Sequence, residues 1–138
     1  MVLKSLLEQE IAPESIHLLV RSQEKAMRVF DAHGFPTLPT IIGDITEDQE
    51  TLRGKVPSDI THFVNMAGSV KFGESARPEV ERVNLHGATT MAKIARAQGK
   101  LTHVSTSYIL GQVDDELQEI FIDKNTERKP KNPYEEAK

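Results

Sequence analysis

Short apolar runs alternate with helical patterns along this chain, and the alternation limits its fold more than any other feature. Four runs have the length and apolar character of buried strands. They are residues 16–20, 40–44, 60–66 and 101–105. Because parallel neighbours need a crossover connection, strands that alternate with helices predict β-α-β units, a mostly parallel sheet and the α/β class.

The segments between the runs contain residues that start or stop helices. The predicted helical segments are residues 2–10, 23–32, 47–53 and 77–98. Ser22 is a predicted N-cap, and Gly34 and Gly99 are predicted helix ends. Residues 112–131 are charged and irregular. The positions predicted to face inward are Ala26, Val29, Phe30, Leu52, Val80, Val83, Ala88, Met91, Ala92 and Ala95.

Composition excludes several classes of function. The length of 138 residues predicts a single domain, and a net charge of −4 argues against nucleic acid or an anionic membrane surface as a partner. The absence of cysteine excludes thiolate chemistry, and the five scattered histidines predict no metal site. No apolar run has the length of a membrane span, so we expect a cytoplasmic protein.

The last residues of the chain hold a possible acid/base pair. Pro133 is suited to the first turn of a helix, which places Tyr134 and Lys138 four residues apart on one helix face. A positive charge beside a phenol favours the phenolate, so this pair suits proton transfer. A tyrosine–lysine pair on a helix is also ordinary surface packing, and other residues have to support the functional interpretation.

Small and polar residues follow all four predicted strands. In open parallel sheets, ligands bind beyond the carboxyl ends of the strands, so these residues are expected at one edge. They are Arg21, Ser22, Asp44, Ala67, Gly68, Ser105 and Thr106.

Two segments carry a resemblance to a known superfamily. They are Asn65-Met66-Ala67-Gly68-Ser69-Val70-Lys71-Phe72 and Ser105-Thr106-Ser107-Tyr108-Ile109-Leu110-Gly111. Together with the terminal tyrosine and lysine, they resemble the extended short-chain dehydrogenase/reductases over nearly the whole chain. They look most like the thioester reductase and fatty acyl-coenzyme A reductase branch, of the male sterility NAD-binding type. The resemblance implies a partial Rossmann-type doubly wound parallel sheet.

The resemblance also implies a catalytic set. Tyr134 matches the family's catalytic acid, and Lys138 matches the lysine that holds the nicotinamide ribose. Thr106 matches the hydroxyl that binds the substrate oxygen. Ser105 and Ser107 are rivals, but Thr106 lies five residues before Gly111, as in the family pattern S-T-x-x-x-x-G.

NADPH is the cofactor that the resemblance favours, with NAD as the alternative. Arg21 and Ser22 lie where the family reads the adenosine ribose, and an arginine there suits the extra phosphate of NADP. Asn84 matches an asparagine that supports the active site. The residues predicted to bind the cofactor are Arg21, Ser22, Asp44, Ile45, Asn65, Ala67, Gly68, Asn84 and Lys138.

The sequence departs from the family at both ends. It contains no first strand with a glycine-rich phosphate loop, and residues 2–10 look like the back half of the helix that follows one. The substrate-binding portion after Lys138 is absent too, so residues 1–138 are predicted to be one truncated dinucleotide-binding domain. We expect the strands to form two pairs, with the gap between them either open or closed by residues 16–20 and 60–66. We also expect weak dinucleotide binding by this chain.

The predicted function is that of a fragment of an NADPH-dependent reductase. Its substrates would be acyl thioesters, carried on coenzyme A or a carrier protein. The alternatives are a nucleotide-sugar epimerase or dehydratase of the same extended type, a non-catalytic dinucleotide-binding module, and a gene fragment without a role of its own.

Overall fold

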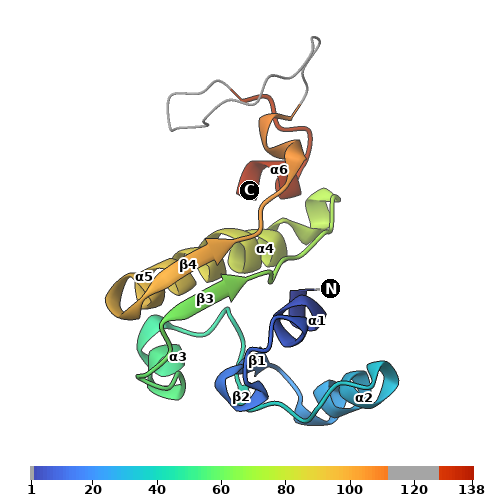
Figure 1. Ribbon diagram of the computed structural model, residues 1–138. Coiled ribbons are helices and arrows are strands. Elements are labelled where there is room, and N and C mark those ends of the chain that lie inside the picture. Colours follow the sequence, from blue (N-terminus) through green and yellow to red (C-terminus); the bar gives the residue numbers. More distant parts are fainter. Residues whose placement is uncertain (1, 112–127) are drawn as a thin grey trace. The chain divides into compact units, whose positions relative to one another are not determined.

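A computed structural model describes residues 2–111 and 128–138 (Figure 1). The chain divides into two compact units, Met1–Pro57 and Ser58–Lys138. Each unit contains one pair of parallel strands together with helices. The predicted α/β class is therefore confirmed. Of the segment predicted to be irregular, residues 112–127 lie outside the described part of the chain.

A β-α-β crossover forms the centre of the first unit. Strands β1 and β2 run parallel, with Leu19 opposite Ile41. The elements of this unit are α1 (Val2–Glu8), the 3-10 helix η1 (Pro13–Ser15), β1 (Leu18–Val20), α2 (Gln23–His33), β2 (Thr40–Ile42) and α3 (Gln49–Lys55).

Helix α2 begins and ends where the sequence predicts. The Ser22 side chain accepts a hydrogen bond from the Lys25 amide at 3.3 Å, and Gly34 ends the helix with a left-handed φ of 65°. Phe30 is buried as predicted, but the inward prediction for Val29 is wrong, because 51% of this residue is exposed. Val29 lies a quarter turn around the helix from Phe30, outside the narrow stripe that packs against the core.

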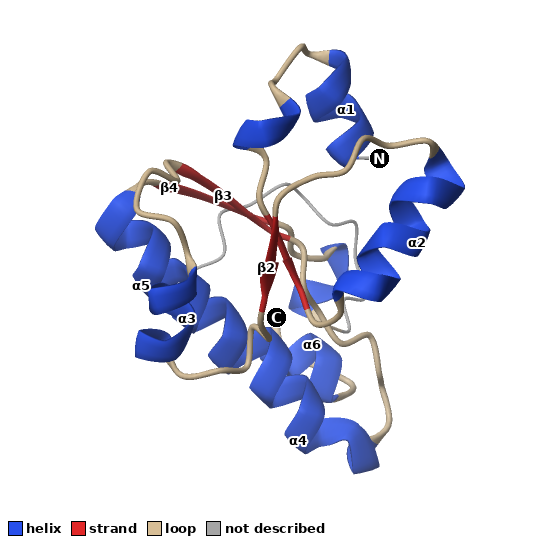
Figure 2. Cartoon of the chain, turned by 90° about the horizontal axis from the view of Figure 1, so that it is seen from below, coloured by secondary structure: helices blue, strands red, loops and turns tan. Residues whose placement is uncertain are grey.

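The second unit contains another parallel pair, with Phe63 opposite Leu101. A long helix, α4 to α5, connects its two strands, and α5 packs against both of them (Figures 1 and 2). The elements are β3 (His62–Asn65), the 3-10 helix η2 (Glu74–Ala76), α4 (Arg77–Val80), the π-helix η3 (Glu81–Gly87), α5 (Ala88–Gln98), β4 (Lys100–His103), the 3-10 helix η4 (Ser107–Leu110) and α6 (Pro133–Ala137).

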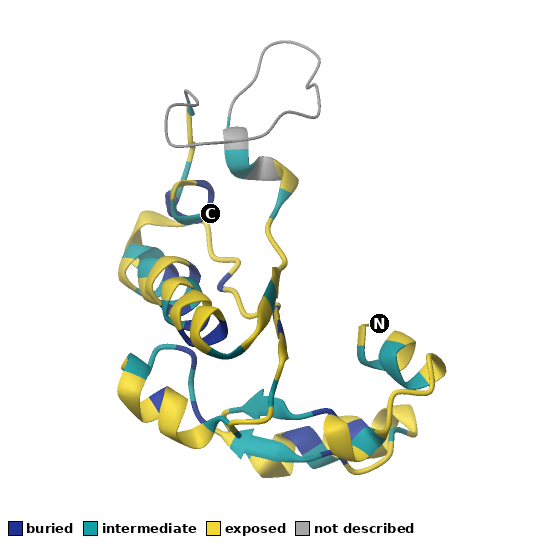
Figure 3. Cartoon of the chain, turned by 60° about the vertical axis from the view of Figure 1, so that its left-hand side comes forward, coloured by how far each residue is buried: buried dark blue, intermediate teal, exposed yellow. Residues whose placement is uncertain are grey.

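The helix predicted over residues 77–98 has the expected length but is not regular. Its middle, Glu81–Gly87, is a π-helix. Ile94 is fully buried although the prediction omitted it, and Ala92 is exposed although it was predicted to be inward. Figure 3 shows buried and exposed residues on opposite sides of this helix.

Three of the four strands are shorter than predicted at their carboxyl ends. They end at Ile42, Asn65, His103 and Val20, and only the last of these is where the sequence predicts. Side chains close turns at two of the ends. The Thr46 amide donates to Asp44 Oδ1 at 2.9 Å, and the Ala67 amide donates to Asn65 Oδ1 at 3.1 Å. These bonds take the place of further rungs between strands.

The strand pairing agrees with the prediction of two pairs. Strand β1 pairs with β2 and β3 pairs with β4, and no ladder joins the two sheets among residues 2–111 and 128–138. Within the same residues, no helix is both long and apolar enough to cross a membrane.

Gly99 gives a test of the second unit's packing. A Cβ atom at this position would lie 2.0 Å from the carbonyl oxygen of Thr61, next to the start of β4. We predict that Gly99→Ala destabilises the second unit by about 1–3 kcal/mol, because backbone has to move. Urea unfolding, followed through amide resonances of that unit, measures the change.

Gly73→Ala is the matched control in the same unit. A Cβ atom at Gly73 would make only an ordinary contact of 3.7 Å with the Ser75 hydroxyl. We expect a change within about 0.5 kcal/mol for this variant. Equal stabilities for the two variants would show that the strand start at Gly99 is not tightly packed.

Candidate active site

Tyr134 lies within helix α6, and Lys138, the other member of the predicted acid/base pair, is the C-cap of this helix. Helix α6 has only five residues, Pro133–Ala137, too few for a helix that is stable alone in water. Asn132 caps it by accepting a hydrogen bond from the Glu135 amide at 3.0 Å, and Pro133 occupies the first turn as predicted. Tertiary packing stabilises the rest of the helix, because Pro133, Tyr134 and Glu135 are all buried.

The buried carboxylate of Glu135 fixes the entry of the chain into α6. Its two oxygens accept hydrogen bonds from the Lys131 amide at 2.7 Å and from the Asn132 side chain at 3.1 Å. The arrangement is a variant of the capping box, in which an acidic side chain reaches back to the residues before the helix. The first turn of α6 is therefore set by its own sequence.

Tyr134 and Lys138 share one face of the short helix. The Lys138 Nζ atom lies 5.8 Å from the centre of the Tyr134 ring. Phe72 packs edge-on against the same ring, with 5.2 Å between centroids and an angle of 70°. Tyr134 is buried, whereas 54% of Phe72 is exposed. The tyrosine is thus held beside both a positive charge and an accessible aromatic surface.

Gly68, Asn84 and Lys138 converge in the second unit. A Cβ atom on Gly68 would lie 3.4 Å from Lys138 Nζ and 3.5 Å from Asn84 Oδ1. The Lys138 ammonium and the Asn84 carboxamide therefore lie close to the Gly68 backbone. Three of the residues predicted from the sequence, from a strand end, a π-helix and the last helix, lie at one place.

Asn84 fixes the loop that contains Gly68. Its Oδ1 accepts from the Ser69 amide at 2.8 Å, and its Nδ2 donates to the Ser69 carbonyl oxygen at 2.9 Å. Both residues are buried. The carboxamide therefore satisfies both backbone groups of one loop residue from a helix 15 positions away.

Asn65 links the end of β3 to the end of β4. Its Oδ1 accepts from the Ala67 amide, so its Nδ2 is the atom that faces His103 Nδ1, at 3.2 Å. His103 therefore accepts at Nδ1 and carries its proton at Nε2. Desolvation of the imidazole lowers the pKa of His103 from its usual value, and the positive charge of Lys138 lowers it further. Lys138 thus acts electrostatically on the end of β4.

Thr106 follows β4 and comes directly before η4. It is partly buried, whereas its rivals Ser105 and Ser107 are exposed. Helix α6 packs against η4, so the segment after Thr106 contacts the helix that contains Tyr134. The assignment of the substrate-binding hydroxyl to Thr106 stays a prediction.

The other predicted cofactor residues lie in the first unit. The Arg21 side chain is 83% exposed and its Nη1 lies 3.9 Å from Asp44 Oδ2. Ser22 uses its hydroxyl to cap α2, and Ile45 is a buried residue. Arg21 and Asp44 therefore lie close to each other, and the Arg21 side chain is the more exposed of the two.

The sequence did not single out several residues that build the site. Arg77 Nη1 donates to Glu136 Oε2 at 2.6 Å, which ties α6 to the start of α4. Arg77 and Glu136 are 59 positions apart, so no local pattern indicates their contact. The other residues missed are Ser69, Phe72, His103 and Arg128.

Comparison with known proteins places the chain among dinucleotide-binding domains. A family model of the NAD-binding type, described as Male sterility protein, matches residues 1–138. The fold is similar to the structure of RMD from Pseudomonas aeruginosa complexed with NADPH, with a TM-score of 0.51 and 19% sequence identity. That match covers 88% of this chain and 45% of the other, and it supports the predicted partial Rossmann-type fold. No curated protein matches the sequence.

The effect of Lys138 on the pKa of His103 leads to a prediction about the pH dependence of stability. Because the pKa of His103 is lower in the folded state, the unfolded state binds more protons in acid. This histidine's contribution to stability should be complete above the unfolded pKa of about 6.5 and decrease as the pH falls toward the folded value. Titration of the His103 imidazole by NMR measures the folded pKa.

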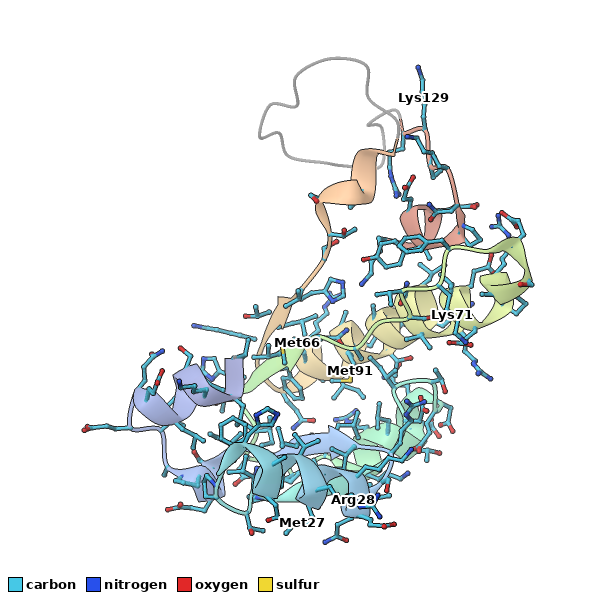
Figure 4. The ribbon with its side chains drawn as sticks, turned by 90° about the vertical axis from the view of Figure 1, so that its right-hand side faces the viewer. Met27, Arg28, Met66, Lys71, Met91 and Lys129 are labelled. Carbon is cyan, nitrogen blue, oxygen red and sulfur yellow. The ribbon has the colours of Figure 1, made fainter. Side chains whose placement is uncertain are left out.

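Lys138→Met should raise the pKa of His103, because one positive charge near the imidazole is removed. The matched control is Lys129→Met, the same substitution at an exposed lysine (Figure 4). An unchanged His103 pKa in Lys138→Met would show that the Lys138 ammonium does not lie near the strand end.

Proposed function

Because the chain belongs to the Male sterility protein family of NAD-binding domains, we propose that it contributes the catalytic residues of an NADPH-dependent reductase of thioester carbonyls. The convergence of Gly68, Asn84 and Lys138 beside Tyr134 is the observation that supports this proposal most directly. It places a proton donor and a cation side by side, and reduction of a carbonyl uses both: one protonates the developing oxyanion and the other stabilises negative charge.

The residues present suit a nicotinamide dinucleotide. Lys138 would donate hydrogen bonds to the hydroxyls of the nicotinamide ribose, and the bare backbone of Gly68 leaves room for the sugar. Asn84 would keep that loop in place through Ser69. In the first unit, the exposed Arg21 suits the 2′-phosphate that distinguishes NADPH from NADH. The bound cofactor would supply hydride to the carbonyl carbon.

Negative charge develops on the substrate oxygen as its carbonyl carbon is reduced. The Thr106 hydroxyl would donate a hydrogen bond to that oxygen, and Tyr134 would transfer its phenolic proton to it. The Lys138 ammonium would stabilise the phenolate that remains. The product of this step is a neutral hemithioacetal, which releases a thiol as its C–S bond breaks and leaves an aldehyde.

The surroundings of Tyr134 favour an acyl chain over a sugar as the group next to the carbonyl. Phe72 packs on the Tyr134 ring yet is 54% exposed, and Val70 in the same loop is 68% exposed. An apolar chain covers such a surface favourably, whereas a polyhydroxylated ring leaves hydroxyls facing it.

Kinetics of Tyr134→Phe and Lys138→Met test the proposal. Because this sequence contains no glycine-rich phosphate loop, the assay uses a protein in which a strand and such a loop precede the chain. NADPH oxidation with an acyl-coenzyme A should lose about 10²- to 10⁴-fold in kcat for Tyr134→Phe, with little change in cofactor binding. Lys138→Met should also weaken cofactor binding, while Lys129→Met is the control with wild-type behaviour.

Other outcomes identify the alternatives. Turnover of nucleotide sugars without turnover of acyl-coenzyme A would favour an epimerase or dehydratase. Unchanged turnover in Tyr134→Phe would exclude the catalytic role of the phenol. A faster reaction with NADH than with NADPH would overturn the role proposed for Arg21.

A further inference from the structure

Arg128 connects two elements that contain candidate catalytic residues. Its Nε donates to the carbonyl oxygen of Ile109 at 2.6 Å, and its Nη2 donates to the carbonyl oxygen of Glu135. Ile109 lies in η4, the turn after Thr106, and Glu135 lies in α6 next to Tyr134. We propose that Arg128 is a positioning residue, which sets the place of Tyr134 relative to Thr106. The proposal rests on the function proposed above.

The two acceptors are backbone groups at the ends of short helices. Carbonyl groups in the last turn of a helix have no amide partner within that helix. Ile109 is the third of four residues in η4, and Glu135 is the third of five in α6. A single guanidinium group therefore satisfies one such oxygen in each helix and places a positive charge near their carboxyl ends, where it is favourable.

Only an arginine side chain makes this pair of bonds well. Its planar fork presents several N–H groups in fixed directions, so it can bridge two carbonyl groups at once. A lysine ammonium keeps the charge but has no fixed fork. The guanidinium is also partly buried, and water competes less for its bonds than at an exposed ion pair.

The backbone directly after Arg128 is paired with the end of η4. Gly111 and Lys129 form a parallel β-bridge next to it. Gly111 has a φ of 72°, and a Cβ atom on it would lie 2.0 Å from the Lys129 carbonyl oxygen. This close contact holds residue 128 against the end of η4, so Arg128 reaches α6 from a defined position.

A second arginine holds α6 differently. Arg77 binds the Glu136 side chain, of which 56% is exposed. Salt screens such an exposed pair, and its contribution to the position of the helix decreases with ionic strength. The bonds of Arg128 go to backbone oxygens and should persist, so an experiment in about 0.5 M salt separates the two arginines.

Three variants of the 138-residue chain test the proposal: Arg128→Ala, Arg128→Lys and the control Lys129→Ala. The Lys129 side chain is exposed and points away from α6 (Figure 4), and its removal takes away a neighbouring positive charge without touching the bridge. Hydrogen exchange of the α6 amides is the first measurement, in about 0.5 M salt.

Both Arg128 variants should exchange the α6 amides about tenfold faster or more than wild type, since bonds to a charged donor are lost. Lys129→Ala should match wild type, and amides of β3 and α5 should be unchanged in all three variants. Full protection in Arg128→Lys would overturn the proposal, because charge alone would then be enough. Equal loss of protection throughout the second unit would overturn it too, because it would indicate a general role in stability.

Kinetics then separate this inference from the proposed function. In the protein that carries the glycine-rich loop, both Arg128 variants should lower kcat by about 10²-fold, because the proton donor is misplaced. The KM for NADPH should rise by a smaller factor, because Lys138 keeps its ammonium group although it follows the displaced helix. If Tyr134→Phe abolishes turnover and the Arg128 variants keep it, the positioning role is wrong and the proposed function stands. If Tyr134→Phe keeps its turnover, the proposed function is wrong, and with it the role of Arg128.

Discussion

A helix of five residues cannot maintain its own shape in water, and the candidate site depends on this fact. Tyr134 lies in such a helix and Lys138 directly follows it, so their positions come from the contacts that hold α6 from outside. Asn132 and Glu135 fix its first turn, while buried Pro133 and Tyr134 anchor it in the second unit. The chemistry proposed for the pair is therefore a consequence of tertiary packing and not of a local helix.

Missing side chains matter as much as the ones present. Gly111 allows the backbone of Lys129 to approach the end of η4, and Gly99 allows the backbone of Thr61 to approach the start of β4. In each place a methyl group would meet a carbonyl oxygen at 2.0 Å, so backbone would have to move. The glycines of this chain thus set distances between elements that are remote in sequence.

Local signals in the sequence predicted the structure well. Ser22, Gly34 and Pro133 act through neighbours within four residues, so their roles could be recognised from spacing alone. The pairing of strands followed from their order. The π-helix η3 could not be predicted, because the buried positions Val80, Asn84, Gly87, Met91 and Ile94 keep the spacing of three and four residues that also predicts an α-helix.

The site was predicted in part. The sequence identified Gly68, Asn84, Tyr134 and Lys138, which the structure brings together in the second unit. It did not identify Arg77 or Arg128, whose partners are fixed by the fold and in one case lie 59 positions away. His103 looked like an ordinary strand residue, and its bond to Asn65 appears only when β3 and β4 are paired.

The central claim is that packing brings the Lys138 ammonium to the backbone of Gly68. Nuclear Overhauser contacts in the 138-residue chain measure this directly. The account predicts cross peaks between the ε protons of Lys138 and the α protons of Gly68, because a Cβ atom there would lie 3.4 Å from Nζ. A Lys138 side chain that shows contacts only within α6 would contradict it.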